Sequence, residues 1–300
     1  MSRARFEKHA EVANPGVASP FAIRLLTRVV LPIVRLIHRA TLDGTEHLPP
    51  SGAFLLVANH PSSVGLSELH AFMALYAKTF RGSRPLAGFA LAATFGWWPL
   101  SWLFPQIGAI PSTYAAARST LAKGVPIAVF PGGDHECMRP FWQFDRADFG
   151  GRVGFLRIAR EAWVPIVPMG FEGVCAPLLL RSRLLPYLFV WPRLAGIKRY
   201  GLSVLAVIGA ALILWLVPLA WHWRALIAWA WAASPLSLLS WWPARIRIRI
   251  GAPIAPETLF GERADAGAKN TNDANEANEA VLRRALPVIE QAVSALVVSV

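Results

Sequence analysis

A short apolar segment that ends at a histidine is the strongest constraint that this sequence places on its fold. Residues 53–58 are apolar, and Asn59, His60 and a small polar loop follow them at once. This order predicts a buried strand, a loop, and a helix from Glu68 to about Lys78. Ligands of open α/β sheets bind in the loops beyond the carboxyl ends of the strands, so His60 lies where a ligand would bind.

The residues alone allow two interpretations of this histidine. An imidazole with an unperturbed pKa of ~6.5 can accept and return a proton near neutral pH, as a general base does. The alternative is a loop histidine with no chemical role.

Apolar runs of the same kind recur along the chain and alternate with helical patterns. Predicted strands occupy 85–90, 106–111, 125–130 and 164–169, and predicted helices occupy 114–123 and 150–162. This alternation predicts an α/β fold.

Composition points to a membrane surface. The chain is 55% hydrophobic and only 16% charged, and it contains 13 tryptophans, whereas soluble domains are ~25% charged. Its net charge of +12 favours an anionic membrane as partner over nucleic acid, for which no recognised motif is present. Cys137 and Cys175 form neither a disulfide framework nor a zinc motif, which fits a reducing compartment. The first residues lack the apolar region of a signal peptide.

Residues 21–40 are predicted to form a basic amphipathic helix that is kinked or broken at Pro32. Apolar residues fill most of its surface, and four arginines share one narrow arc, namely Arg24, Arg28, Arg35 and Arg39. The pattern favours a helix that lies in a membrane interface. A helix packed on the protein's own core with a solvated basic stripe is the alternative.

The run from 201 to 244 contains a single formal charge, at Arg224. A spanning helix needs ~20 apolar residues, so we expect two adjacent helices that span or re-enter the bilayer, with Arg224 in the turn between them. An interfacial element and a buried helical insertion are the alternatives. The aromatic residues of 91–104 are expected to line an apolar groove, contact lipid or pack in the core.

The C-terminal part begins with strict alternation of arginine and isoleucine over 245–250. This predicts a half-buried strand whose arginines face either a solvated edge or lipid phosphate. The polar stretch 262–279 is predicted to be a flexible linker or a frayed helix start, and 280–300 a terminal helix packed on the domain or on the membrane.

A tight turn, Pro131-Gly132-Gly133-Asp134, follows the predicted strand over 125–130, and its glycines permit positive φ angles or close approach to a ligand. Ionisable residues crowd the stretch that follows: His135, Glu136, Arg139, Asp145, Arg146, Asp148 and Arg152. They can bind substrate or form ion pairs within the loop, and Arg152 can pair with Asp148. His135 is the alternative to His60, but no third ligand at metal-site spacing accompanies it, so no metal is predicted.

Several separated segments together resemble the glycerolipid acyltransferases of the lysophosphatidate-acyltransferase type, in particular their bacterial lysophospholipid and diacylglycerol acyltransferase-like branch. The segments are ANHPSSVGLSE (58–68), IGAIP (107–111), AVFPGGDHECMRPF (128–141), DFGGRVGFLRIAREA (148–162) and VPIVPMG (164–170). The resemblance covers residues 45–255 and implies a mixed sheet flanked by helices, with an N-terminal amphipathic helix and an apolar membrane-associated helical insertion. The expected parts are a polar leader and basic helix over 1–44, an acyltransferase core over 45–200, the insertion over 201–244, a returning strand over 245–260, and a linker with a terminal helix over 261–300.

The resemblance implies acyl transfer from a thioester, acyl-CoA or acyl carrier protein, to the hydroxyl of a lysophospholipid or diacylglycerol, with His60 as the base. Gly65 stands where the family has an aspartate, so Glu68, the nearest carboxylate, is predicted to orient His60. No serine or cysteine lies in an activated-nucleophile motif, so the transfer would be direct. The backbone of the glycine turn would bind an anion or an oxyanion. The predicted substrate-binding residues are Asn59, Ser62, Ser63, Gly132, Gly133, Asp134, Arg139 and Arg152.

The expected setting is the cytoplasmic face of a bacterial inner membrane, with membrane lipid as partner and no cofactor besides the thioester co-substrate. Nothing in the sequence indicates an oligomeric state. Gly65 favours an alternative, a catalytically impaired, membrane-bound lipid-binding homologue. A small integral membrane protein such as a transporter subunit would explain 201–244 but not the α/β pattern that precedes it.

Overall fold

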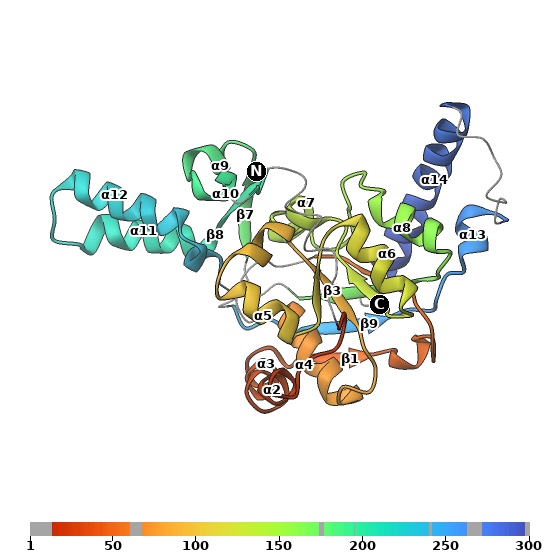
Figure 1. Cartoon of the computed structure of the whole chain (residues 1–300). Coiled ribbons are helices and arrows are strands. Elements are labelled where there is room, and N and C mark those ends of the chain that lie inside the picture. The colour runs from red at the N-terminus through yellow and green to blue at the C-terminus, as the bar shows by residue number, and fades with distance from the viewer. Residues whose placement is uncertain are drawn as a thin grey trace.

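The computed structural model describes residues 14–60, 68–173, 177–194, 196–239, 242–262 and 272–297. Within them the chain forms a seven-stranded sheet with helices on both faces, and a separate two-stranded ribbon that carries a helical hairpin (Figure 1). The predicted α/β architecture is therefore confirmed.

The order of strands across the large sheet is β1-β9-β6-β2-β5-β3-β4. These strands are β1 (Thr41–Asp43), β2 (Leu55–Ala58), β3 (Ala87–Ala90), β4 (Ala109–Pro111), β5 (Ile127–Val129), β6 (Ile166–Glu172) and β9 (Arg247–Ile250). Neighbouring strands are parallel except β6 and β9, so the sheet is mixed. β2 lies at the centre and all of its side chains are fully buried, which explains why this segment is uniformly apolar rather than alternating.

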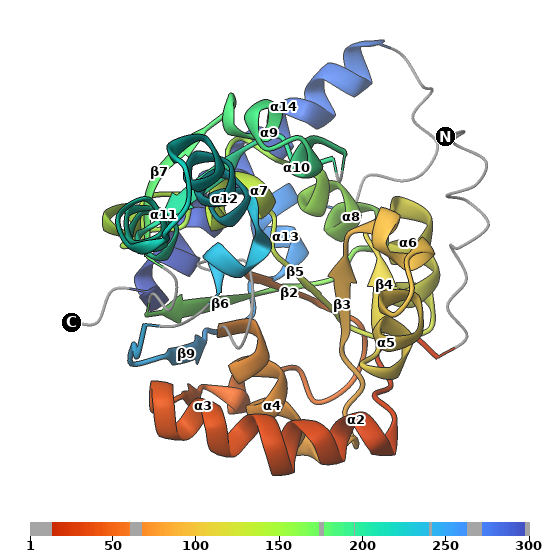
Figure 2. The same cartoon turned by 90° about the vertical axis from the view of Figure 1, so that its left-hand side faces the viewer.

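One face of the sheet is covered by the N-terminal helical segment and α4 (Glu68–Phe80), as Figure 2 shows. The N-terminal segment is α2 (Pro20–Leu25), the π-helical turn η1 (Leu26–Val30) and α3 (Leu31–His38), which run on without a break. The irregularity predicted at Pro32 therefore takes the form of a π turn immediately before it.

This N-terminal segment has two distinct faces. Its inner face packs against α4 and the sheet through Ala22, Leu26, Leu31 and Val34. The four arginines of the predicted basic stripe are exposed, and exposed apolar side chains such as Leu36 lie beside them. The segment thus combines core packing with a mixed basic and apolar outer surface.

The opposite face of the sheet is covered by α6 (Tyr114–Ala122), α8 (Gly154–Ala162), α13 (Pro256–Phe260) and α14 (Asn272–Val297). α14 packs tightly on β6, because a Cβ atom added at Gly170 would lie 2.6 Å from Leu296. The terminal helix is thus packed on the domain, and it already begins inside the stretch predicted to be a linker or frayed start. Shorter elements complete the body: η2 (Thr45–His47), η3 (Ala92–Gly96), α5 (Leu100–Gln106), α7 (Gly133–Cys137) and η4 (Phe141–Gln143).

The ribbon module follows β6 and has a small core of its own. It consists of β7 (Leu178–Ser182), α9 (Leu185–Leu188), α10 (Trp191–Leu194), β8 (Tyr200–Ser203), α11 (Val204–Leu216), α12 (Trp221–Ala233) and η5 (Pro235–Leu238). The hairpin of α11 and α12 projects away from the sheet (Figure 1). Among the described residues, no helix has both the length and the apolar character needed to cross a bilayer. The predicted pair of spanning helices is therefore not confirmed.

The predicted strand at 245–250 is confirmed as β9, but its environment is not the one expected. β9 lies inside the sheet, between β1 and β6, and its isoleucines are buried. Arg249 is 2.9 Å from Glu172 of β6 and Arg247 is 3.4 Å from the same carboxylate. The suggestion that these two arginines face lipid phosphate is therefore wrong, because an acidic neighbour in the sheet already pairs with them.

Candidate active site

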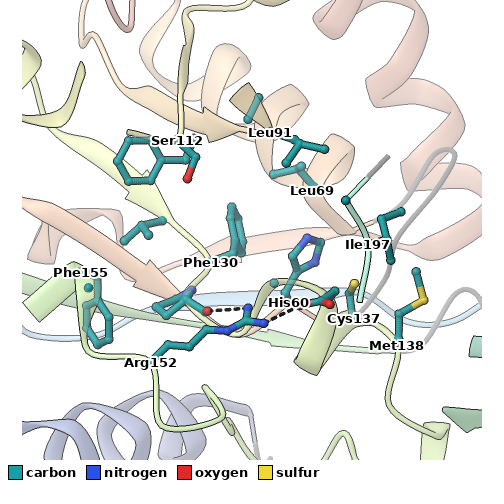
Figure 3. Close-up of a pocket in the computed structure, with 18 of the residues that line it drawn as sticks. His60, Leu69, Leu91, Ser112, Phe130, Cys137, Met138, Arg152, Phe155 and Ile197 are labelled. Carbon is teal, nitrogen blue, oxygen red and sulfur yellow. Dashed lines mark hydrogen bonds and ion pairs between the residues drawn. The ribbon is translucent and has the colours of Figure 1, made fainter. Parts of the chain in front are cut away.

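A cavity of about 700 Å³ lies at the carboxyl ends of four parallel strands. Its lining includes His60, Leu91, Ser112 and Phe130, which directly follow β2, β3, β4 and β5 or lie one residue further on. Figure 3 shows these side chains converging on the same space. His60 therefore lies beside a cavity at the carboxyl ends of the strands, the edge at which ligands of open α/β sheets bind. Its binding or catalytic role stays a prediction.

His60 stands at the junction of two cavities. It is half-buried, and its ring lies 5.1 Å from that of Phe130. A second cavity, of about 430 Å³, extends under α4 and the N-terminal helical segment, and it is lined mainly by apolar side chains such as Leu26, Phe72 and Met73. His60, Leu69 and Phe130 line both cavities. Two apolar spaces thus meet at one imidazole.

A buried carboxylate fixes the backbone of this histidine. Glu136 of α7 is fully buried and accepts hydrogen bonds from the backbone N–H of His60 at 2.9 Å and of Asp148 at 3.0 Å. It also pairs with buried Arg139 at 3.2 Å, which donates to the carbonyl oxygen of Arg146. Burial raises the pKa of the Glu136 carboxyl to about 7, while the hydrogen bonds and the charge of Arg139 oppose that rise.

The two glycines of the turn are required by the side chains that pack against them. A Cβ atom at Gly132 would lie 2.3 Å from the Glu136 carboxylate, and one at Gly133 would lie 2.7 Å from the Arg152 guanidinium. Gly133 also has a positive φ of 45°, which favours glycine. Its N–H donates to the carbonyl oxygen of Phe130, so the expected anion-binding role of this N–H is not met.

Arg152 and Asp134 form the polar end of the cavity. The Arg152 guanidinium lies 2.5 Å from Asp134 and donates to the carbonyl oxygen of Gly132 at 2.6 Å (Figure 3). Asp134 also accepts a hydrogen bond from the backbone N–H of Lys198 in the ribbon module. Burial acts to raise the pKa of Asp134, but the hydrogen bond and charge of Arg152 outweigh it and the pKa is lowered. The sequence allows Arg152 to pair with Asp148 as an alternative to binding substrate, but its carboxylate partner is Asp134.

Two residues predicted to bind substrate belong to the scaffold instead. Asn59 is buried, donates from Nδ2 to the carbonyl oxygen of Phe171 at 3.0 Å, and accepts the Phe171 N–H at 2.8 Å. It therefore joins the end of β2 to β6. Arg139 is 1% exposed and is held by Glu136 and by the ring of Phe144. Neither residue is part of the cavity lining.

Glu68, the predicted partner of His60, lies next in sequence to a residue of the cavity lining. Glu68 is buried at the start of α4, directly before Leu69, which lines both cavities together with His60. Ser62, Ser63 and Gly65 lie outside the described residues.

His135, the alternative to His60, is not part of the cavity lining and makes other contacts. Its Nε2 lies 2.9 Å from Asp148, and its carbonyl oxygen accepts from Arg181. Among the described residues, no group of three His, Cys, Asp or Glu side chains could hold a metal ion. Cys137 does line the cavity, but burial, together with the charges of Asp134 and Glu136, raises the pKa of its thiol to about 12. A protonated thiol is a poor nucleophile.

Comparison with known proteins finds a matching sequence family for part of the chain. Residues 39–172 match the sequence model of the Acyltransferase family. The match covers slightly less than half of the chain, so this segment is similar to the acyltransferase family. The matched segment includes β2, β5, α7, α8 and β6, and with them both His60 and Arg152.

Uncharacterized proteins of Mycobacterium bovis and Mycobacterium tuberculosis are 29% identical to this chain over 170 residues, which are 55% of it. The match covers 47% of those proteins, so the chain spans about half the length of the curated relatives it matches. The crystal structure of the 1-acyl-sn-glycerophosphate acyltransferase PlsC from Thermotoga maritima aligns with 92% of this chain and 80% of that one, at 15% identity and a TM-score of 0.42.

Sequence reasoning missed the residues that shape the site from outside the family segment. Trp191, Gly196, Ile197 and Leu238 of the ribbon module line the cavity, although they are more than a hundred residues from His60 along the chain. No local pattern could reveal this contact. The contact of Glu136 with the turn, in contrast, has a local signal in the sequence. Gly132, four residues earlier, leaves room for a side chain to pack against the turn.

Proposed function

We propose that this protein is an acyltransferase that moves an acyl chain from a thioester donor to the hydroxyl of a glycerolipid, a lysophospholipid or diacylglycerol, with His60 as general base. The observation that carries the proposal is the position of His60 between two apolar cavities. Direct transfer requires a donor chain and an acceptor chain to meet at one base, and two joined apolar spaces suit such a pair.

The chemistry needs only a proton to move at the imidazole. The Nε2 or Nδ1 atom of His60 would accept the proton of the acceptor hydroxyl as its oxygen attacks the thioester carbonyl, and would return it to the leaving thiolate. Glu68 would hold the tautomer and stabilise the imidazolium. The protonated state of Cys137 supports transfer without a covalent enzyme intermediate.

We propose that the α11–α12 hairpin inserts into the interfacial region of the bilayer. Exposed apolar and aromatic side chains cover it, among them Trp215, Trp221, Trp223 and Trp229. Each helix has 13 residues, so each is about 20 Å long, which is shorter than the ~30 Å hydrocarbon core. Tryptophan favours the interface, and apolar patches of this kind mark interaction surfaces. The net charge of +12 would favour the anionic cytoplasmic face of a bacterial inner membrane.

The chemistry is tested with purified protein in detergent, labelled acyl-CoA or acyl carrier protein, and a panel of lysophospholipids and diacylglycerol. His60→Ala is expected to abolish transfer, while His222→Ala on exposed α12 retains it. Glu68→Gln is expected to lower kcat and also the pKa seen in the kcat/KM profile, because the carboxylate stabilises the imidazolium, while Glu161→Gln on the surface changes neither. Full activity in His60→Ala would refute the mechanism. Lipid binding without transfer for any donor would favour the lipid-binding homologue that Gly65 suggests.

Membrane association is tested with vesicles of neutral and anionic lipid. The wild type is expected to sediment with anionic vesicles, and Trp215→Ser/Trp221→Ser is expected to weaken the partition severalfold. Trp163→Phe removes a tryptophan at the other end of the molecule and serves as the matched control. Equal partition of all three proteins would contradict the role of the hairpin.

A further inference from the structure

The ribbon module and Arg152 together enclose a strongly basic pocket that the catalytic proposal does not use. Its volume is about 410 Å³. None of its eight lining residues is acidic, and five are cationic, namely Arg152, Arg183, Arg193, Lys198 and Arg199. We refer to these five residues as the basic pocket.

The charges of the basic pocket are largely uncompensated. Arg152 pairs with Asp134, but within the described part of the chain the other four side chains form no ion pair with a carboxylate. Like charges in one concavity repel one another, and this repulsion also acts on Arg181, which lies nearby in β7. Burial and the charge of Arg199 lower the pKa of Arg181. An arrangement that costs free energy in the empty protein is most simply explained by an anionic ligand.

The pocket is also partly preorganised. The Arg193 guanidinium lies 5.0 Å above the ring of Tyr187, which holds a flexible side chain in place. Pro186 is buried beside it. Lys198 is held through its backbone N–H by Asp134. Surface arginines that merely increase solubility would not need such supports.

The basic pocket adjoins the catalytic cavity. Arg152 lines both spaces, and Ile197 lines the cavity while its neighbour Lys198 lines the pocket. A ligand could therefore place an anionic group in the pocket and the rest of its length in the cavity that His60 faces. This favours a substrate over an unrelated anion.

We propose that the basic pocket binds the phosphate groups of the thioester donor, so that the donor is a coenzyme A thioester. A phosphomonoester carries about −1.5 to −2 charges at neutral pH, so the four cations that form no ion pair within the described residues exceed what one headgroup phosphate needs. They suit a molecule with a diphosphate and a further phosphomonoester. Arginine is well matched to phosphate because its guanidinium donates two parallel hydrogen bonds. The inference rests on the proposed acyl transfer and specifies its donor.

The test is direct binding of coenzyme A to the full chain in detergent, by titration calorimetry, so that it does not depend on catalysis. Arg183→Gln/Arg193→Gln is expected to raise the Kd for coenzyme A about ten-fold or more, since each charge-assisted hydrogen bond lost is worth at least that. Arg28→Gln/Arg284→Gln removes the same charge from exposed positions outside the pocket and is expected to leave the Kd unchanged. Dephospho-coenzyme A, which lacks the phosphomonoester, is expected to bind wild type more weakly and to lose less in the variant.

Two results would overturn the assignment. One is a Kd for coenzyme A that is equal in wild type and the Arg183→Gln/Arg193→Gln variant. The other is a variant whose KM rises for lysophosphatidate but not for the acyl-CoA, which would assign the pocket to the acceptor. A failure of the proposed acyl transfer would give a different result. Coenzyme A would then bind more weakly to the Arg183→Gln/Arg193→Gln variant than to wild type, but no product would form.

Discussion

Replacing Asn59 by leucine is expected to lower the free energy of unfolding by about 2–4 kcal/mol. Leucine has nearly the same shape but cannot form the hydrogen bonds that Asn59 makes with the N–H and the carbonyl oxygen of Phe171. Both partners are buried at the centre of the sheet, between β2 and β6. Each buried group left without a partner costs about 1–3 kcal/mol, and the greater apolar burial of leucine offsets part of that loss.

The measurement is urea unfolding followed by tryptophan fluorescence, with the slope m compared between proteins to confirm that the same surface is exposed. Thr27→Val provides the control, because the Thr27 hydroxyl donates only to the carbonyl oxygens of Ile23 and Arg24 within one partly exposed helical turn of the described chain. Such changes stay within about 0.5 kcal/mol. The loss for Asn59→Leu is a large fraction of the about 5–15 kcal/mol typical of a domain. A loss below about 0.5 kcal/mol would refute the view that Asn59 joins the two strands.

Asn59→Asp distinguishes lost hydrogen bonds from altered packing. An ionised aspartate still accepts the Phe171 N–H but meets the Phe171 carbonyl oxygen with a second oxygen. Burial and that contact raise the pKa of the new carboxyl in the folded state. Its stabilising contribution is then present below the unfolded pKa of ~3.9 and is lost as the pH rises through the raised folded value. Asn59→Asp should therefore approach wild type in acid and separate from it at pH 8, whereas Asn59→Leu should stay displaced at both.

Three further predictions concern the carboxylate, the second cavity and the hairpin. Burial raises the pKa of Glu136 from 4.5 to about 7, so the unfolding free energy of the wild type should fall as the pH rises from 4.5 through 7. Glu136→Gln should lack this pH dependence. An equal pH dependence in the two proteins would contradict the prediction. Gly88 lines the second cavity, and a Cβ atom at Gly88 would meet nothing within 4 Å. Gly88→Leu should therefore shift the acyl-chain preference in transfer assays toward shorter chains. An unchanged preference would exclude that cavity as the binding site of an acyl chain. A Cβ atom at Gly209 would lie 2.1 Å from the Trp231 indole, so Gly209→Val should separate α11 from α12 and reduce vesicle binding, whereas Ala210→Val should not.

The sequence allowed the central strands and the helices around them to be predicted because burial on both faces leaves a clear apolar signal. β2, β3, β4 and β5 lie within predicted runs, and β6 begins within the run 164–169 but extends to Glu172. The position of His60 could be predicted for the same reason. The partners of Asn59 and Arg139 could not, because nothing in a sequence distinguishes a polar side chain that faces a ligand from one that faces a buried backbone group. The apolar hairpin was recognised as apolar, but its two helices are each interrupted, near Pro218 and Pro235, before they reach the length of a membrane span.

The segment 39–172 and the ribbon module contribute different parts of the site, which suggests how donor and membrane preference arise. The segment 39–172 supplies His60 and the buried Glu136 that fixes it, whereas 177–239 supplies one wall of the cavity, four cations of the basic pocket and the exposed hairpin. Leu238 lines the cavity and belongs to η5, which immediately follows α12. A bilayer that holds the hairpin would therefore also hold the cavity close to the lipid surface. On this basis, exchanging the ribbon module between related chains should change donor and membrane preference while the base and its scaffold remain the same.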